Sequence, residues 1–220
     1  MDSFVKGLED VFRVHRNKDQ AGPMAQYMKN NFEFFGIKSK QRRDLLRGYV
    51  RRVGKPDLNT LPVILTDLWK HPKREMQYVG LDLLSRVEKK LPLTFITKIE
   101  QLIIHKSWWD TVDALAVISG EILRRYPESI ARITDSWIAS DNMWLQRSGL
   151  IFQLRYKEET NWPMMEDYIT RVYLNPEFFI QKACGWALRQ YSKTNPEAVK
   201  TFVETHELSS VCRREAIKYI

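Results

Sequence analysis

Prolines recur along most of this chain at an almost constant interval. Pro56, Pro92, Pro127, Pro163 and Pro196 are separated by 36, 35, 36 and 33 residues, and each precedes an apolar pattern of helical period. Proline is favoured in the first turn of a helix, because its missing N–H group has no partner to lose there. The spacing therefore predicts a repeating unit that opens with a helix.

A second helix follows the first in each unit. These second helices are expected to begin near His71, Ser107, Asp141, Asn175 and Leu208. Tandem helical hairpins of about 35 residues are typical of α-helical solenoids, in which each unit buries its apolar face against its neighbours. The consensus residues of tetratricopeptide and ankyrin repeats are missing, and so are Asn-Gly and Asp-Gly hairpin signals. We expect an all-α fold, a right-handed superhelical solenoid of HEAT-like hairpins.

The N-terminal part predicts three further helices, near residues 3–15, 22–34 and 39–53. A chain of 220 residues with 44% hydrophobic residues is long enough to bury a core. We therefore expect a single domain over residues 1–220, with N-terminal helices over 3–53 and hairpin repeats from about 56 to 220.

The composition favours a polyanionic partner. Lys and Arg number 35 against 27 Asp and Glu, which gives a net charge of +8 and points to nucleic acid, although charge alone does not exclude a membrane surface. The chain has no apolar run of transmembrane length and no basic, then apolar, leader pattern at its start. Cys184 and Cys212 fall in periodic segments and are expected to be buried free thiols. We expect a soluble, cytoplasmic monomer without a membrane partner.

Two N-terminal segments are candidates for contact with nucleic acid. The segment over residues 38–52 contains seven basic residues and one acid, Asp44. A solvated helix face is the usual reading of a charge run, but such faces normally mix signs, so phosphate contact is favoured. In the preceding predicted helix Met24, Tyr27 and Met28 share a side that is more often core, although Tyr27 with Lys29 could instead face a nucleic-acid groove.

Sliding the sequence by one repeat aligns a polar row on the second helices. The row consists of Gln77, Asp113, Arg147, Lys182 and Arg214. Second helices usually line the concave surface of a solenoid, so this row predicts a cleft wall. Trp109 lies one turn before Asp113 and Trp186 one turn after Lys182, so both indoles can flank the cleft. The alternative is a buried Arg–Asp pair packed under two aromatic rings.

The absence of several common catalytic and binding motifs restricts the chemistry. The sequence contains no Gly-x-Gly, no His-Glu-x-x-His, no Cys-x-x-Cys and no Gly-x-Ser-x-Gly. We therefore expect neither a metal nor a nucleotide cofactor. A carboxylate between indoles in a basic groove suits the stabilisation of an oxocarbenium-like sugar. Asp113 could stabilise that charge and position water, and Trp109 and Trp186 could add cation–π attraction. No acid for a leaving base is evident, which favours bases that are already cationic, such as N3- or N7-alkylated purines.

Long blocks of this sequence resemble one known family. They are PMAQYMKN (23–30), KSWWDTVD (106–113), WIASDNMWLQR (137–147), FFIQKA (178–183) and RREAIK (213–218). With these blocks the chain resembles, over essentially its whole length, the AlkD family of HEAT-like DNA alkylation-repair glycosylases. Related proteins that lack the early helix containing Tyr27 have lost lesion recognition, so its presence here favours an active enzyme. Lys38 departs from relatives that carry an uncharged residue there.

The resemblance implies removal of 3-methyladenine- and 7-methylguanine-type lesions from double-stranded DNA, as the first step of base excision repair. It implies that the base is not drawn into a tight pocket. The catalytic positions that it implies are Asp113, Trp109, Trp186 and Arg147. The expected DNA contacts are Tyr27, Lys29, Lys38, Lys40, Arg43, Arg47, Lys182, Arg213 and Arg214. A non-catalytic solenoid that binds distorted or branched DNA remains the alternative, ahead of a protein-interaction scaffold.

Overall fold

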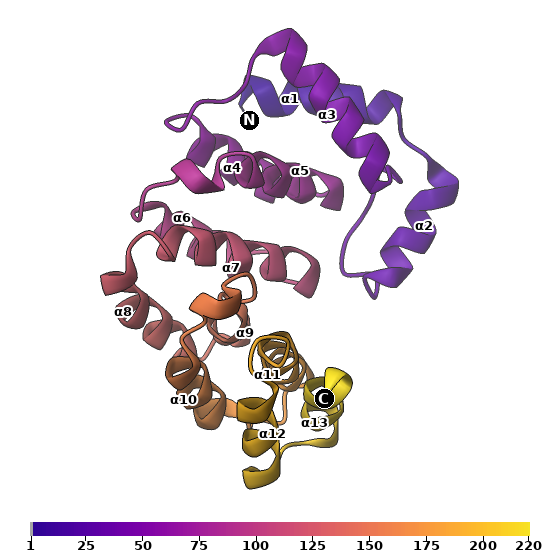
Figure 1. Ribbon diagram of the computed structural model, residues 1–220. Helices are drawn as coiled ribbons and strands as arrows, with labels where there is room; N and C mark the ends of the chain where they lie inside the picture. Colours follow the sequence, from indigo (N-terminus) through magenta and orange to yellow (C-terminus); the bar gives the residue numbers. More distant parts are fainter. Residues whose placement is uncertain (1) are drawn as a thin grey trace. The chain divides into compact units, whose positions relative to one another are not determined.

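The regular structure of the protein is helical. The computed structural model describes residues 2–220, which contain thirteen α-helices and three short 3₁₀ helices (Figure 1). Within these residues the β-type pairing is a single isolated bridge between Glu33 and Lys73. The all-α prediction is confirmed. Over the same residues no helix has the length and apolar character needed to cross a membrane.

The helices form two compact units, residues 1–87 and 88–220. The first unit contains α1 (Ser3–Val14), α2 (Lys18–Tyr27), α3 (Ser39–Val53), α4 (Leu61–Lys70) and α5 (Arg74–Ser85). The second contains η1 (Glu88–Lys90), α6 (Phe95–Ile103), α7 (Trp109–Leu123), α8 (Pro127–Ile138), α9 (Met143–Ile151), η2 (Lys157–Glu159), α10 (Trp162–Val172), α11 (Phe178–Tyr191), α12 (Pro196–Thr205), α13 (Ser210–Ala216) and η3 (Ile217–Tyr219). The single-domain organisation stays a prediction.

The second unit is built from stacked helical hairpins. α6 packs on α7, α8 on α9, α10 on α11 and α12 on α13, while the second helices α7, α9, α11 and α13 also contact one another in succession. Apolar residues of both helices in each hairpin are buried, so each hairpin closes its core against the next. Pro127 and Pro196 open α8 and α12, and Pro163 is the second residue of α10. The repeat inferred from proline spacing is confirmed for these hairpins.

Two of the expected helix starts were wrong. Pro56 and Pro92 lie several residues before α4 and α6, and Pro62 is the proline in the first turn of α4. The second helices also begin two or three residues later than expected. Their starts follow the capping side chains: Asn142 accepts hydrogen bonds from the first turn of α9, and Ser209 accepts one from Cys212 at the start of α13.

The helix expected over residues 22–34 is displaced towards the N-terminus. α2 begins after Asn17, whose side chain caps the first turn, and it ends before Lys29 and Asn30, which have positive φ values of 57° and 59°. Residues 34–37 are not helical, because the buried Glu75 carboxylate accepts three backbone N–H groups there, from Phe35, Gly36 and Ile37 at 3.0, 2.8 and 3.0 Å. The conformation of this segment thus depends on a carboxylate that lies 38 to 40 positions further along the chain.

α3 has the bounds that the sequence predicted. Its buried face includes Leu46, Tyr49 and Val50, and Arg42 joins that face by pairing with Asp82 of α5, with Nε 2.9 Å from Oδ2. Cys184 and Cys212 are buried and free, as expected.

Gly36 provides a test of the α1–α3 packing. Its φ is +88°, and a Cβ atom there would lie 1.9 Å from the carbonyl oxygen of Asn17. Gly36→Ala should therefore lower the free energy of unfolding by more than about 2 kcal/mol, measured by urea denaturation. Gly22→Ala in α2 is the matched control: a Cβ there has nothing within 4 Å, and we expect a gain of about 0.5–1 kcal/mol. Equal stability of the two variants would contradict the described packing.

Candidate functional site

A bidentate ion pair joins α7 and α9. Nε of Arg147 donates to Oδ1 of Asp113 at 2.7 Å, and Nη2 donates to Oδ2 at 2.8 Å. The third arm of the guanidinium, Nη1, donates to the backbone oxygen of Phe179 at the start of α11, at 2.6 Å. One side chain thus connects three successive second helices. The sequence analysis aligned Asp113 and Arg147 in one polar row, and the structure pairs them; the catalytic roles of these residues stay predictions.

The pair is largely shielded from water. The side chain of Asp113 is 17% exposed and that of Arg147 is 5% exposed. Burial raises the pKa of Asp113, whereas the hydrogen bonds and charge of Arg147 lower it and the nearby charge of Asp110 raises it again; the net shift is upward. Asp113 is therefore a stronger base than an ordinary aspartate.

An aromatic cluster packs next to this pair. Its ring centroids are 5.1 Å apart for Trp108 and Phe179, 5.9 Å for Trp108 and Trp144, and 4.9 Å for Trp144 and Phe179. The guanidinium carbon of Arg147 lies 6.0 Å from the Phe179 ring. The sequence analysis missed this cluster, although its members recur at the repeat interval. The cluster fixes the start of α11, where the backbone oxygen of Phe179 accepts the hydrogen bond from Nη1 of Arg147.

The structure relates the two predicted tryptophans to Asp113 in different ways. Trp109 is the first residue of α7 and lies four residues before Asp113, so both project from one face of that helix, and both are partly exposed. Trp186 lies on α11, one turn after Lys182, and is also partly exposed. In the described part of the chain no ring contact or hydrogen bond joins Trp186 to Asp113. Its place beside the carboxylate stays a prediction.

The polar row does not form one continuous wall. Gln77 is fully buried and donates to the backbone oxygens of Leu68 and His71 at 2.6 and 3.0 Å, so its expected place in a cleft was wrong. A buried amide nitrogen needs acceptors, and these two carbonyls at the end of α4 supply them.

The basic residues of the C-terminal helices are partly engaged within the protein. Nζ of Lys182 donates to Glu215 at 2.5 Å, and Arg189 pairs with the same carboxylate. Burial raises the pKa of Glu215, but the two cations outweigh it and the net shift is downward. Arg213 donates to the backbone oxygen of Val203 at 2.7 Å. Arg214 is exposed. Lys182 and Arg213 would have to leave these partners, or share them, to contact DNA.

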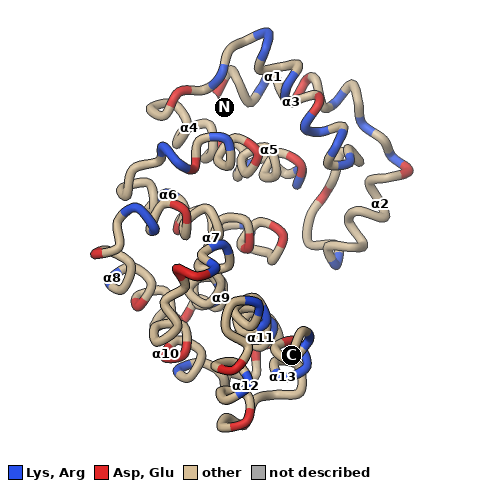
Figure 2. The backbone as a smooth tube through the Cα atoms, in the orientation of Figure 1, with Lys and Arg blue, Asp and Glu red and all other residues tan. Residues whose placement is uncertain are grey.

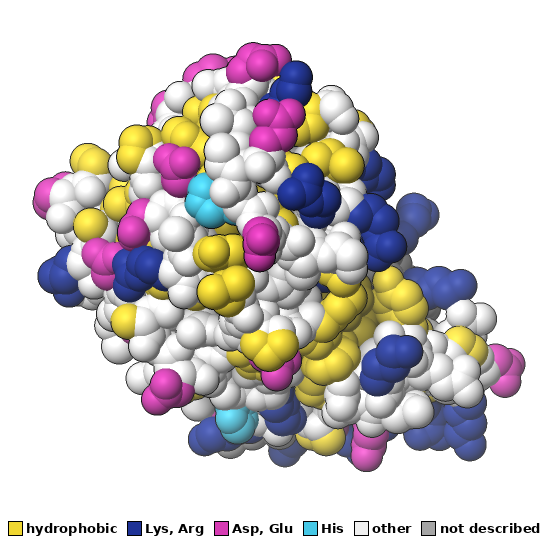
Figure 3. Space-filling model, turned by 90° about the horizontal axis from the view of Figure 1, so that it is seen from below, with side chains coloured by type: hydrophobic (Ala, Val, Ile, Leu, Met, Phe, Trp, Pro, Cys, Tyr) yellow, Lys and Arg dark blue, Asp and Glu magenta, His cyan; other side chains and the backbone are white. Residues whose placement is uncertain are grey.

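In the first unit the predicted DNA contacts are exposed. They are Tyr27, Lys29, Lys38, Lys40, Arg43 and Arg47. Figure 2 shows how densely basic positions follow one another along α3. Tyr27 is 69% exposed although its neighbour Met28 is buried, so the core reading of Tyr27 was wrong. On the face drawn in Figure 3, acidic side chains are scattered mainly over the upper and left parts, whereas basic side chains are most numerous along the right side.

The pKa of Asp113 can be measured directly. Carboxyl ¹³C NMR should place it above that of an ordinary aspartate, because burial outweighs Arg147. Arg147→Lys should raise it further, because a lysine keeps the charge but cannot make the two parallel hydrogen bonds. The spectrum of Asp113→Asn identifies the resonance. A pKa at or below the ordinary value, or one unchanged by Arg147→Lys, would contradict the described balance.

Comparisons with known proteins give one consistent result. A model of the family described as "DNA alkylation repair enzyme" matches residues 8–220. The chain is similar to a solved structure described as a predicted DNA alkylation repair enzyme from Enterococcus faecalis, with 32% identity and a TM-score of 0.87 over 93% of this chain and 96% of that chain. A search of curated proteins found no match.

Proposed function

Because this chain belongs to the family of DNA alkylation repair enzymes, we propose that it is a monofunctional DNA glycosylase. Its substrates are cationic N3- and N7-alkylated purines in double-stranded DNA, and the reaction is hydrolysis of the N-glycosidic bond. The observation that carries this proposal is the Asp113 carboxylate, held through both oxygens by Arg147 in a site that is mostly shielded from water.

The reaction needs stabilisation of positive charge on the sugar. As the bond between C1′ and the base nitrogen breaks, its electron pair goes to the alkylated purine, which leaves as a neutral base, and the sugar acquires oxocarbenium character. Water then adds to C1′ and loses a proton. Asp113 supplies negative charge for the first step and accepts the proton in the second. Its raised pKa makes it the better proton acceptor.

Arg147 is a positioning residue in this scheme. It uses one lone pair on each oxygen of Asp113, and each oxygen retains another that can accept a hydrogen bond from water. The pairing also fixes the plane of the carboxylate. Preorganised charge of this kind needs little reorientation when the reaction occurs.

The indole of Trp109 adds to the same effect. It projects from the same face of α7 as Asp113, and the electron-rich face of an indole attracts a developing cation by about 0.5–2 kcal/mol. Trp186 is assigned the same role from the family resemblance. Close to Asp113, the described residues place the guanidinium of Arg147, aromatic rings and the charge of Asp110. Such surroundings suit a base that departs without being protonated.

We assign DNA affinity to four exposed basic residues at the start of α3 and just before it: Lys38, Lys40, Arg43 and Arg47. Arg47 forms an ion pair at 3.4 Å with Asp44, which is the one acidic residue of this segment. Cations of this kind release counterions from the phosphate backbone, which makes binding strong at low salt and independent of sequence.

Replacing the proposed base tests the proposal. Asp113→Asn should reduce release of 7-methylguanine from methylated duplex DNA by about a hundredfold or more, measured by chromatography with enzyme in excess, while duplex binding persists. Asp82→Asn is the matched control, because Asp82 is also held bidentately by an arginine, Arg42, but lies outside the site. Release that is unchanged in Asp113→Asn, or lost equally in both variants, would refute the assigned role.

The pH profile provides an independent test. Asp113 must be ionised to act, and its pKa is raised, so the enzyme-dependent rate should fall as the pH is lowered through a midpoint above the ordinary aspartate value of about 3.9. Arg147→Lys should move that midpoint upward. Release without enzyme is subtracted at each pH, since alkylated purines depart spontaneously. A rate that stays level to the ordinary aspartate range would argue against Asp113 as the titrating group.

The exposed basic face of α3 also favours a second candidate, a non-catalytic protein that binds distorted or branched DNA. This candidate predicts tight, salt-sensitive binding without release of any base. Wild-type protein that binds methylated duplex DNA but releases no base with enzyme in excess would decide for it.

A further inference from the structure

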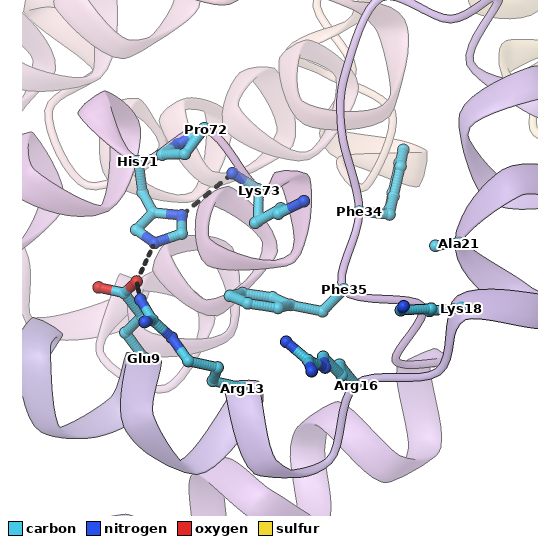
Figure 4. Close-up of a pocket in the computed structure, with 10 residues that line it drawn as sticks. All are labelled: Glu9, Arg13, Arg16, Lys18, Ala21, Phe34, Phe35, His71, Pro72 and Lys73. Atoms are coloured by element: carbon cyan, nitrogen blue, oxygen red, sulfur yellow. Dashed lines mark hydrogen bonds and ion pairs between the residues drawn. The ribbon is translucent and has the colours of Figure 1, made fainter.

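A cavity of about 430 Å³ lies within the first unit, and Asp113 is not among the residues that line it. It is formed by the end of α1, the start of α2, the non-helical segment before α3 and the turn between α4 and α5 (Figure 4). Cavities of about 300–1,000 Å³ are the usual size of small-molecule sites. Neither the family nor the proposed glycosylase reaction assigns a role to it.

One wall of this cavity is aromatic and fixed. Phe34 and Phe35 line it, and each is less than a tenth exposed. The Phe35 ring is held by an edge contact with Phe12, at 6.0 Å between centroids, and by His71 at 5.8 Å. Figure 4 shows Phe35 between the His71–Glu9 pair on one side and Lys18 with Ala21 on the other. The Phe35 side of the cavity is therefore held in place by contacts within the protein.

The single acid that lines the cavity is already neutralised. Glu9 pairs with Arg13, and its Oε1 lies 3.5 Å from Nε2 of His71. Burial raises the pKa of Glu9, but these two partners outweigh it and the net shift is downward, which keeps the group ionised. Lys73 is likewise paired, with Glu33 at 3.0 Å.

Two cations remain at the cavity mouth. Arg16 and Lys18 line it and are exposed, and within residues 2–220 neither takes part in an ion pair. The neighbouring acid, Asp19, does not line the cavity. Lys18 is also the first residue of α2, whose N-terminal dipole adds positive potential. The cavity thus offers about two unbalanced positive charges beside an apolar wall.

We propose that this cavity binds a nucleotide through its phosphomonoester, with Arg16 and Lys18 at the phosphate and the nucleoside against Phe34 and Phe35. A phosphomonoester carries about −1.5 to −2 charges at pH 7, which matches the two cations, and arginine binds phosphate through two parallel hydrogen bonds. A phosphate alone would leave the aromatic wall uncovered. The same chemistry is presented by a free nucleoside monophosphate and by the 5′-phosphorylated end of a DNA strand.

Calorimetric titration of the full chain tests this proposal. Deoxyadenosine 5′-monophosphate should bind at least about tenfold more tightly than deoxyadenosine or inorganic phosphate, because only the nucleotide engages both the cations and the aromatic wall. The double variant Arg16→Ala/Lys18→Ala should weaken the binding of the nucleotide about tenfold or more. Arg132→Ala/Lys200→Ala is the matched control, because it removes the same charge at two exposed positions of the second unit. Circular dichroism checks that both double variants are folded.

Three results would overturn the proposal: no binding of the nucleotide by the wild-type protein, equal weakening in both double variants, or deoxyadenosine binding as tightly as its phosphate. Asp113→Asn should bind the nucleotide as the wild type does, because Asp113 does not line the cavity. The nucleotide proposal can therefore hold even if the glycosylase proposal fails. Two duplexes that differ only in a 5′-phosphate or a 5′-hydroxyl end then identify the source. Competition by the phosphorylated duplex alone assigns a strand end, and competition by neither assigns the free nucleotide.

Discussion

The site in the second unit depends on the hydrogen bonds that the guanidinium of Arg147 donates. This guanidinium directs separate N–H groups to both oxygens of Asp113 on α7 and to a backbone oxygen at the start of α11, while its own helix, α9, packs between them. A buried guanidinium is costly unless its donors are satisfied, so the fold is most stable when all three contacts form together. The placement of the carboxylate is thereby tied to the packing of the hairpins.

An ion pair of this geometry is not sufficient to make a reactive site. Arg42 and Asp82 form the same bidentate arrangement between α3 and α5, yet there it serves to attach a helix whose other basic residues face solvent. Asp113 differs in its surroundings: Trp109 projects from the same helix face, and burial raises its pKa despite the arginine. The proposed reactivity of Asp113 therefore rests on the environment of the carboxylate rather than on the pair itself.

The repeat period accounts for what the sequence could predict. Equivalent positions on stacked hairpins become neighbours, so a shift of one repeat brings Asp113 to Arg147, and the same shift would have found the rings of Trp108 and Trp144. The repeat period does not predict contacts between residues that occupy different positions in their repeats. Glu75, which fixes the segment before α3, and Glu215, which engages Lys182, lie off the aligned row, so periodicity alone does not predict their contacts.

The two units hold their charges differently. At the proposed reaction site the charge of Asp113 is balanced by Arg147, so this pair carries little excess charge, and around α11 and α13 two cations share the carboxylate of Glu215. Lys38, just before α3, and Lys40 and Arg43 on α3 face solvent and form no ion pair within the described residues. Long-range attraction to phosphate depends on excess charge, whereas stabilisation of a transition state depends on fixed and partly dehydrated charge. One surface cannot maximise both properties, because pairing that fixes a charge also cancels its distant field.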